Sequence, residues 1–224
     1  MNNPHQHLSA LQDIRTMMEK SSRFISLSGF SGIAAGTCAL MGAWAAYDHV
    51  YGPHEVVSYA DVQLYRIGTG TAPDITALIT NSLFQIAAVT FLAALISSFI
   101  FTYIKSRKDG IPIWGKTARR LLINVCVPLL AGGLYLLKLV DQGSFGLIAP
   151  GCLIFYGLAL LNGSKFTLNE IKYLGYGQLA LGIINLWFTG YGLYFWAVGF
   201  GILHIVYGIV MWYRYDRGTK NSEA

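Results

Sequence analysis

Long apolar segments alternate with short charged segments along this chain. Six apolar runs lie between the charged stretches, at residues 24–46, 75–104, 121–140, 145–161, 173–189 and 192–213. A helix that crosses a membrane needs roughly 20 mostly apolar residues, because the hydrocarbon core is about 30 Å thick. The pattern therefore predicts an all-α, polytopic integral membrane protein with six transmembrane helices.

The residues before the first run have a different pattern. We expect residues 1–23 to form a short amphipathic helix on the cytoplasmic surface, because their apolar side chains share one helical face. A solvated helix without membrane contact and a cleaved signal peptide are the alternatives. The whole chain, 1–224, then forms one membrane domain, in which the bundle of residues 24–213 precedes a cytoplasmic tail of residues 214–224. The apolar residues of the first helix are Leu8, Leu11, Ile14, Met17 and Met18.

Composition supports the membrane assignment. Hydrophobic residues make up 54% of the chain and charged residues 12%, which is about half the charged fraction of ordinary soluble domains. Such a composition excludes a disordered chain, and the three cysteines are too few for a disulfide scaffold. All three cysteines fall inside apolar runs, where we expect them to behave as small buried hydrophobic residues.

The positive charges predict the orientation. Fourteen of the 16 Lys and Arg residues lie in segments that the six spans would place on one side of the membrane, and only Arg66 and Lys138 lie on the other. Positively charged flanks stay in the cytoplasm, so we expect a multi-pass protein of the bacterial inner membrane with both termini cytoplasmic. The net charge of +5 then faces anionic lipid headgroups, and nucleic acid is not expected as a partner.

Small residues recur at four-residue spacing within the spans, where they allow helix backbones to approach closely. We interpret them as helix-packing positions, with a homo-oligomer contact as the alternative. Pro128 and Pro150 each remove a backbone donor and are predicted to kink spans three and four. The small residues include Ser28, Gly32 and Gly36 in the first span, Gly132, Gly133, Gly151, Gly157 and Gly182 in the next ones, and Gly201 and Gly208 in the last.

Polar residues inside the spans are costly in lipid and therefore indicate a site. His204 lies well inside the sixth span, at a depth between those of Gln178 and Asn185 on the fifth. A neutral imidazole can bond to either amide, and Tyr207 or Tyr156 can join from nearby. We predict either a proton-sensitive or ligand-binding pocket formed by these five residues, or a polar clamp that holds the helices together.

Two smaller clusters lie toward the outer side. Asp48, His49, His54 and Glu55 are four potential metal ligands within eight residues, which is a weak prediction of a divalent cation site, with a solvated loop as the alternative. Lys138 and Asp141 are three residues apart and can form an ion pair on one helical face.

Signatures of common enzymes are absent. The chain has no nucleotide-binding glycine loop, no HExxH pair and no Gly-x-Ser-x-Gly elbow. We therefore assign no catalytic residue and expect no cofactor, and a lipid enzyme using Asp48, His49 and His54 is the remaining catalytic alternative. The favoured function is a non-catalytic membrane component that packs with partners or responds to stress. A transporter or binding protein for a small molecule or ion, with its pocket around His204, is the second hypothesis.

The stretch from Val127 to Tyr213 carries a resemblance to known proteins. Its sequences GSFGLIAP at 143–150 and GFGILHIVYG at 199–208 resemble those of a family of bacterial six-helix inner-membrane proteins that has no assigned activity. The architecture is also similar to that of small six-helix acid-resistance membrane proteins. The resemblance implies a helical membrane fold and no catalytic role.

Overall fold

The structure is a computed structural model that describes residues 28–52, 79–110 and 113–216. All regular structure in these residues is helical, as the sequence predicts. The predicted amphipathic helix at residues 1–23 and most of the predicted tail lie outside the described residues.

Six rods follow one another along the chain. The first five are formed by α2 (Gly29–Tyr51), α5 (Ser82–Lys108), α6 (Lys116–Asp141), α7 (Ile148–Gly163) and α8 (Glu170–Trp187). One turn of 3-10 helix lies on each side of α7, at Phe145–Leu147 and Ser164–Phe166. The sixth rod begins with the turn Thr189–Tyr191 and continues through α9 (Gly192–Trp196), a π-helical segment (Ala197–Ile202), α10 (Leu203–Met211) and a second π-helical segment (Trp212–Asp216).

Five of these rods are long and apolar enough to cross a membrane. Helix α5 has 27 residues and is therefore ~40 Å long. The exception is α8, which has 18 residues and is not apolar enough over that length. Glu170 and Lys172 lie in its first turn, and Gln178 and Asn185 lie further along. Gln178 and Asn185, from which the sequence predicts a site, thus also lower the hydropathy of α8.

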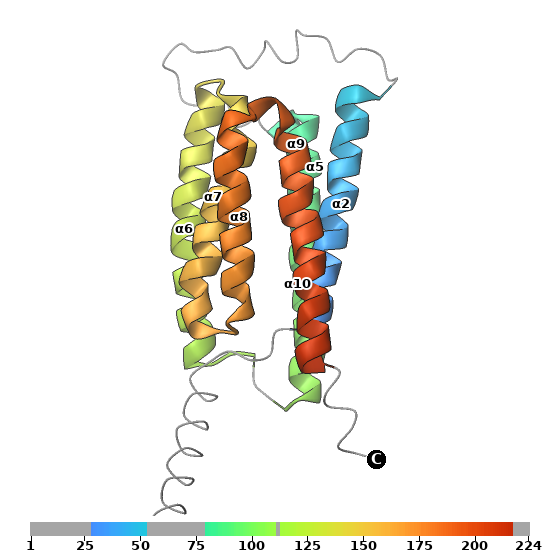
Figure 1. The fold of residues 1–224 in the computed structure, drawn as a ribbon, viewed down its shortest axis with the longest axis vertical. Helices are drawn as coiled ribbons and strands as arrows, with labels where there is room; N and C mark the ends of the chain where they lie inside the picture. Colours follow the sequence, from blue (N-terminus) through green and yellow to red (C-terminus); the bar gives the residue numbers. More distant parts are fainter. Residues whose placement is uncertain (1–27, 53–78, 111–112, 217–224) are drawn as a thin grey trace, which may run out of the picture.

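The rods are arranged in two halves (Figure 1). In one half α2 packs between α5 and α10, and in the other α7 packs between α6 and α8. The halves meet where the sixth rod packs against α7 and α8. The beginning of α2 and the end of the sixth rod lie at the same end of the bundle. This end also holds the loop between α5 and α6 and the beginning of α8.

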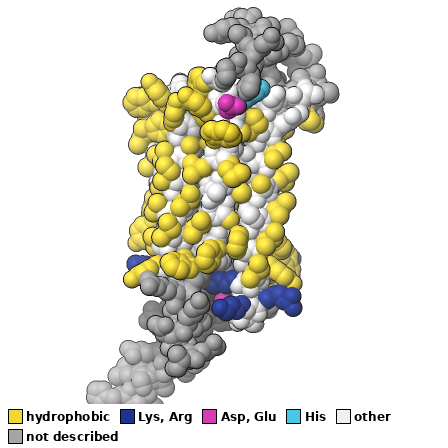
Figure 2. Space-filling model, turned by 90° about the vertical axis from the view of Figure 1, so that its right-hand side faces the viewer, with side chains coloured by type: hydrophobic (Ala, Val, Ile, Leu, Met, Phe, Trp, Pro, Cys, Tyr) yellow, Lys and Arg dark blue, Asp and Glu magenta, His cyan; other side chains and the backbone are white. Residues whose placement is uncertain are grey.

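Apolar side chains lie mainly on the outside of the bundle. Figure 2 shows them over the middle of its surface, with Lys and Arg gathered at one end. The two outer helices are the extreme case, because α5 buries only Thr90 and Ser106 and α6 only Gly132 and Leu139. A soluble protein places its apolar residues inside, whereas helices in a bilayer bury small and polar residues and expose apolar ones to lipid.

Glycines provide the closest contacts between helices. A Cβ atom at Gly29 would lie 2.6 Å from the Gly208 carbonyl, and one at Gly208 would lie 2.6 Å from the Gly29 carbonyl. Gly157 and Gly175 form a similar contact between α7 and α8, where a Cβ at Gly157 would lie 2.9 Å from the Gly175 carbonyl. The packing role of Gly208 and Gly157 is therefore confirmed, and both pack within one chain. Gly133 differs, because a Cβ there would have no neighbour within 4 Å.

One local prediction, the kink at Pro150, needs correction. Pro150 is the third residue of α7, where a helix has no internal partner for a backbone N–H, so it does not interrupt the helix as predicted. Pro128 does lie inside α6. Helix α5 begins at Ser82, where the Asn81 side chain accepts a bond from the Phe84 amide (3.1 Å) and caps it. Residues 79 and 80 before this cap are also helical, and residues 75–78 of the predicted run lie outside the described residues.

Candidate functional site

The five predicted site residues lie where the two halves of the bundle meet. Gln178 and Asn185 come from α8, His204 and Tyr207 from α10, and Tyr156 from α7. Gln178 and Asn185 are fully buried and His204 is 7% exposed. We call these five residues the polar seam. Gln178 and Asn185 are seven residues apart and so share one face of α8, and Gly182 between them packs directly on the α7 backbone at Ile154.

Hydrogen bonds join three of the five residues. The His204 Nδ1 lies 3.1 Å from the Gly199 carbonyl, and the Tyr156 hydroxyl lies 2.8 Å from His204 Nε2. A carbonyl only accepts, so Nδ1 carries the proton, Nε2 accepts, and the Tyr156 hydroxyl donates. Gln178 Nε2 also donates to the Gly199 carbonyl at 2.7 Å. Both ring nitrogens of His204 are therefore satisfied by the protein.

The backbone at Gly199 allows the Gln178 amide and the His204 ring to reach the same carbonyl group. Gly199 lies in the π-helical segment, in which the Leu203 amide bonds to the Val198 carbonyl five residues earlier, so the backbone pattern departs from an α-helix. A Cβ atom at Gly199 would lie 2.7 Å from Gln178 Oε1, so only glycine lets the amide approach this closely. Widened turns of this kind often occur at functional sites.

Aromatic rings surround the imidazole. The His204 ring stacks with Tyr156 and Phe200 at centroid separations of 5.5 and 6.1 Å, and Trp196 packs against Phe200 at 5.1 Å. Together with the two hydrogen bonds, these rings fix the orientation of His204.

The rest of the polar seam lacks protein partners. Gln178 Oε1, both side-chain polar atoms of Asn185 and the Tyr207 hydroxyl are buried without a hydrogen bond. The sequence suggests that His204 bonds to one of the two amides. In the structure Gln178 Nε2 is 3.5 Å from His204 Nδ1, but both nitrogens donate to the Gly199 carbonyl, so they share an acceptor and do not bond to each other. Asn185 has no hydrogen bond through its side chain. Asn185 is thus part of the seam by position and burial, and not by bonding.

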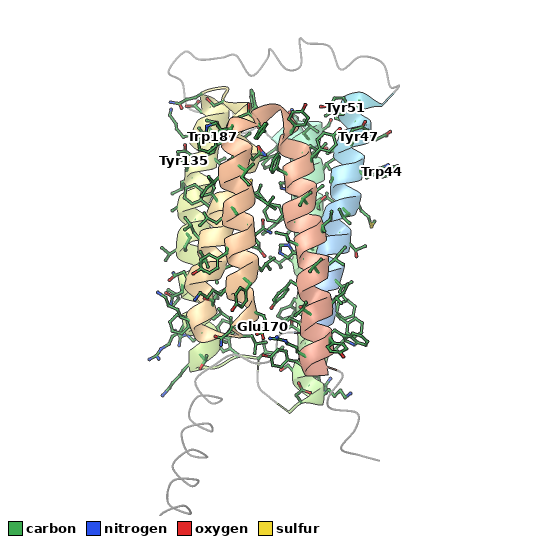
Figure 3. All side chains as sticks on the ribbon, in the orientation of Figure 1. Trp44, Tyr47, Tyr51, Tyr135, Glu170 and Trp187 are labelled. Atoms are coloured by element: carbon green, nitrogen blue, oxygen red, sulfur yellow. The ribbon has the colours of Figure 1, made fainter. Side chains whose placement is uncertain are left out.

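A charged group that the sequence analysis overlooks lies on the same contact, toward the end of the bundle where α2 begins (Figure 3). Glu170, the first residue of α8, accepts bonds from Arg214 Nη1 (2.8 Å) and the Tyr215 hydroxyl (3.1 Å) through Oε1, while its Oε2 is buried without a partner. Helical spacing could have found Glu170, because it precedes Gln178 by eight residues on the same face. No sequence pattern indicates the Gly199 carbonyl as an acceptor.

The structure bears differently on the two smaller clusters predicted from the sequence. Asp48 and His49 lie in the last turn of α2, whereas His54 and Glu55 lie outside the described residues, so the cation site stays a prediction. Within the described ranges no group of three potential metal ligands occurs. Lys138 and Asp141 form the predicted ion pair.

Comparisons of the chain with protein families, with curated proteins and with solved structures find no match. The resemblance to six-helix inner-membrane proteins therefore stays a prediction.

Proposed function

We propose that the six rods cross the bacterial inner membrane, with the end that carries Glu170 and Arg214 facing the cytoplasm. The apolar outer surface supports this placement, because it suits lipid tails. All described Lys and Arg residues except Lys138 lie at that end, where they can contact anionic headgroups. Exposed aromatic rings such as Trp44 and Trp187 lie toward the opposite end (Figure 3), as expected at a headgroup boundary.

We further propose that the polar seam binds a small uncharged molecule with hydrogen-bonding groups, and lets it pass between the two halves. The observation that carries this proposal is the set of unpaired polar atoms on Gln178, Asn185 and Tyr207. A buried polar atom without a partner costs roughly 1–3 kcal/mol, and such atoms in native proteins are normally satisfied by water or ligand. A small polar molecule between the halves would supply the missing partners.

The chemistry of the seam favours an uncharged molecule. Its two fully buried amides, Gln178 and Asn185, offer both donors and acceptors but no formal charge. Ion-coupled transport normally uses charged groups buried within the spans, and the charged residues of this contact, Glu170 and Arg214, lie at its inner end.

Osmotic swelling of proteoliposomes in glycerol or urea tests the proposal. We expect the wild-type protein to accelerate swelling and Asn185→Leu to return it to the rate of protein-free liposomes. Because Asn185 has no protein hydrogen bond to lose, this variant should keep its thermal stability. Asn162→Leu is the matched control, since Asn162 bonds to Asn124 between α6 and α7, away from the seam. Solute passage would be contradicted if liposomes with Asn185→Leu swelled at the wild-type rate. It would also be contradicted if liposomes with the wild-type protein swelled no faster than protein-free liposomes.

The second candidate is a non-catalytic membrane component in which the seam only clamps the two halves. The complete hydrogen bonding of His204 favours it. A clamp predicts that His204→Ala or Gln178→Ala lowers the unfolding temperature while the wild type has no effect on swelling.

A further inference from the structure

The inner half of the contact between the two halves holds a series of groups that can donate and accept protons. We propose that His204 exchanges a proton with the end of the bundle that carries Glu170, which is the cytoplasmic end in the orientation proposed above, along a path formed by Tyr156, Tyr207 and Glu170, with water bridging the gaps on either side of Tyr207. Such a path would make the protonation of the bundle core sensitive to the cytoplasm.

The path ends at His204 Nε2. Nδ1 is occupied, because it donates to the Gly199 carbonyl, whereas Nε2 accepts from the Tyr156 hydroxyl at 2.8 Å. A proton can therefore reach the ring only at Nε2, and Tyr156 is the group in contact with it. No charged residue of the described chain bonds to the imidazole.

Tyr207 occupies the middle of the path. It lies three residues after His204 on the same face of α10, and a Cβ atom at Gly32 of α2 would lie 3.2 Å from its ring. Its hydroxyl is buried without a hydrogen bond, and Tyr207 lies along the sixth rod between His204 and Tyr215, the residue that bonds to Glu170. A buried hydroxyl that the protein leaves unpaired is a usual position for bound water, and a hydroxyl can donate and accept at once.

Glu170 is the entry group. One carboxylate oxygen, Oε1, is held by Arg214 and Tyr215, which leaves Oε2 buried and unpaired. Arg214 is 62% exposed at its side chain, and Arg keeps its proton at any physiological pH. Glu170 is therefore the group at this end that can take a proton from solvent and release it inward.

Transfer along the path moves one proton from Glu170 to His204 and leaves both tyrosines protonated. A proton bound at Oε2 moves through water to the Tyr207 oxygen as Tyr207 releases its own proton through water to Tyr156. Tyr156 in turn passes its proton to His204 Nε2. Both tyrosines end with one proton each, Glu170 returns to the carboxylate, and His204 becomes an imidazolium.

A pH jump followed by time-resolved infrared spectroscopy tests the path. The full-length protein in lipid nanodiscs would carry ring-labelled histidine, with His5, His7, His49 and His54 replaced by glutamine so that His204 alone reports. After a jump from about pH 8 to about pH 5, the range in which histidine ordinarily titrates, the imidazolium band of the parent protein should rise. In Tyr207→Phe it should rise at least about tenfold more slowly, because the variant lacks the hydroxyl that transfers the proton.

Tyr207→Phe is the informative variant, since the lost hydroxyl has no protein partner and the fold should be retained. Tyr173→Phe is the control, because Tyr173 lies on α8, the helix that carries Glu170, but is 73% exposed. Glu170→Gln should slow the rise of the imidazolium band to a similar degree. Equal rates in the parent protein and Tyr207→Phe would overturn the path, as would the absence of an imidazolium band at the end of the jump.

The path and the solute site are separable. Asn185→Leu should abolish swelling without changing the rise of the imidazolium band, and Tyr207→Phe should slow the band whether or not the protein passes glycerol or urea. A failure of one experiment thus leaves the other informative.

Discussion

Gly208→Ala is expected to lower the free energy of unfolding by about 1–3 kcal/mol, because the added methyl group overpacks the contact between α2 and α10. A Cβ atom there would lie 2.6 Å from both the Gly29 carbonyl and the Ile33 amide nitrogen. Both neighbours are backbone atoms of a helix, so neither can move aside alone, and the two helices must separate. Thermal or steric-trap unfolding of the protein in detergent micelles measures the effect.

Gly133→Ala is the control for this prediction. Gly133 lies inside α6 with no neighbour within 4 Å of a Cβ atom, so the substitution should stabilise the protein by about 0.5–1 kcal/mol through helix propensity. If both variants changed stability by the same amount and sign, the close backbone contact of α2 with α10 would be wrong.

Arg214→Ala is expected to destabilise the bundle by about 1–3 kcal/mol, because of the two described donors to the largely buried Glu170 carboxylate it leaves only the Tyr215 hydroxyl. The exposed Arg214 side chain keeps the effect below that of a fully buried ion pair. Glu170→Gln should cost less, since the amide oxygen can still accept from Arg214 and Tyr215 while the buried charge is removed.

Chemical or thermal unfolding of the two single variants and the double variant measures this difference. Once Glu170 is glutamine, removal of Arg214 should have a smaller effect than in the wild type. Additive losses in the double variant would show that Arg214 and Glu170 do not interact, and would contradict the contact between α8 and the end of the sixth rod.

The helices could be predicted from the sequence because the hydrocarbon core imposes a length and a composition on each one. The run at 121–140 corresponds to α6, and the run at 192–213 corresponds to the sixth rod. The prediction failed where a local effect decides the outcome. Pro150 falls in a first turn where its missing N–H has no consequence.

The residues of the polar seam could be predicted in part for a similar reason. Polar residues within apolar runs are visible in a sequence, so Gln178, Asn185 and His204 could be found. Their bonding could not, because the acceptor that joins Gln178 to His204 is the backbone carbonyl of Gly199. That carbonyl is presented by a π-helical segment, and the hydrophobic pattern does not distinguish such a segment from an ordinary helix.

The orientation of the bundle in the membrane is the claim on which the proposed function depends. In a variant without native cysteines, Tyr51→Cys and Lys108→Cys place single thiols at opposite ends of the bundle, where both positions are exposed. We expect a membrane-impermeant maleimide to label Tyr51→Cys in intact spheroplasts, and to label Lys108→Cys only after the membrane is opened. Labelling of Lys108→Cys in intact spheroplasts would contradict the account.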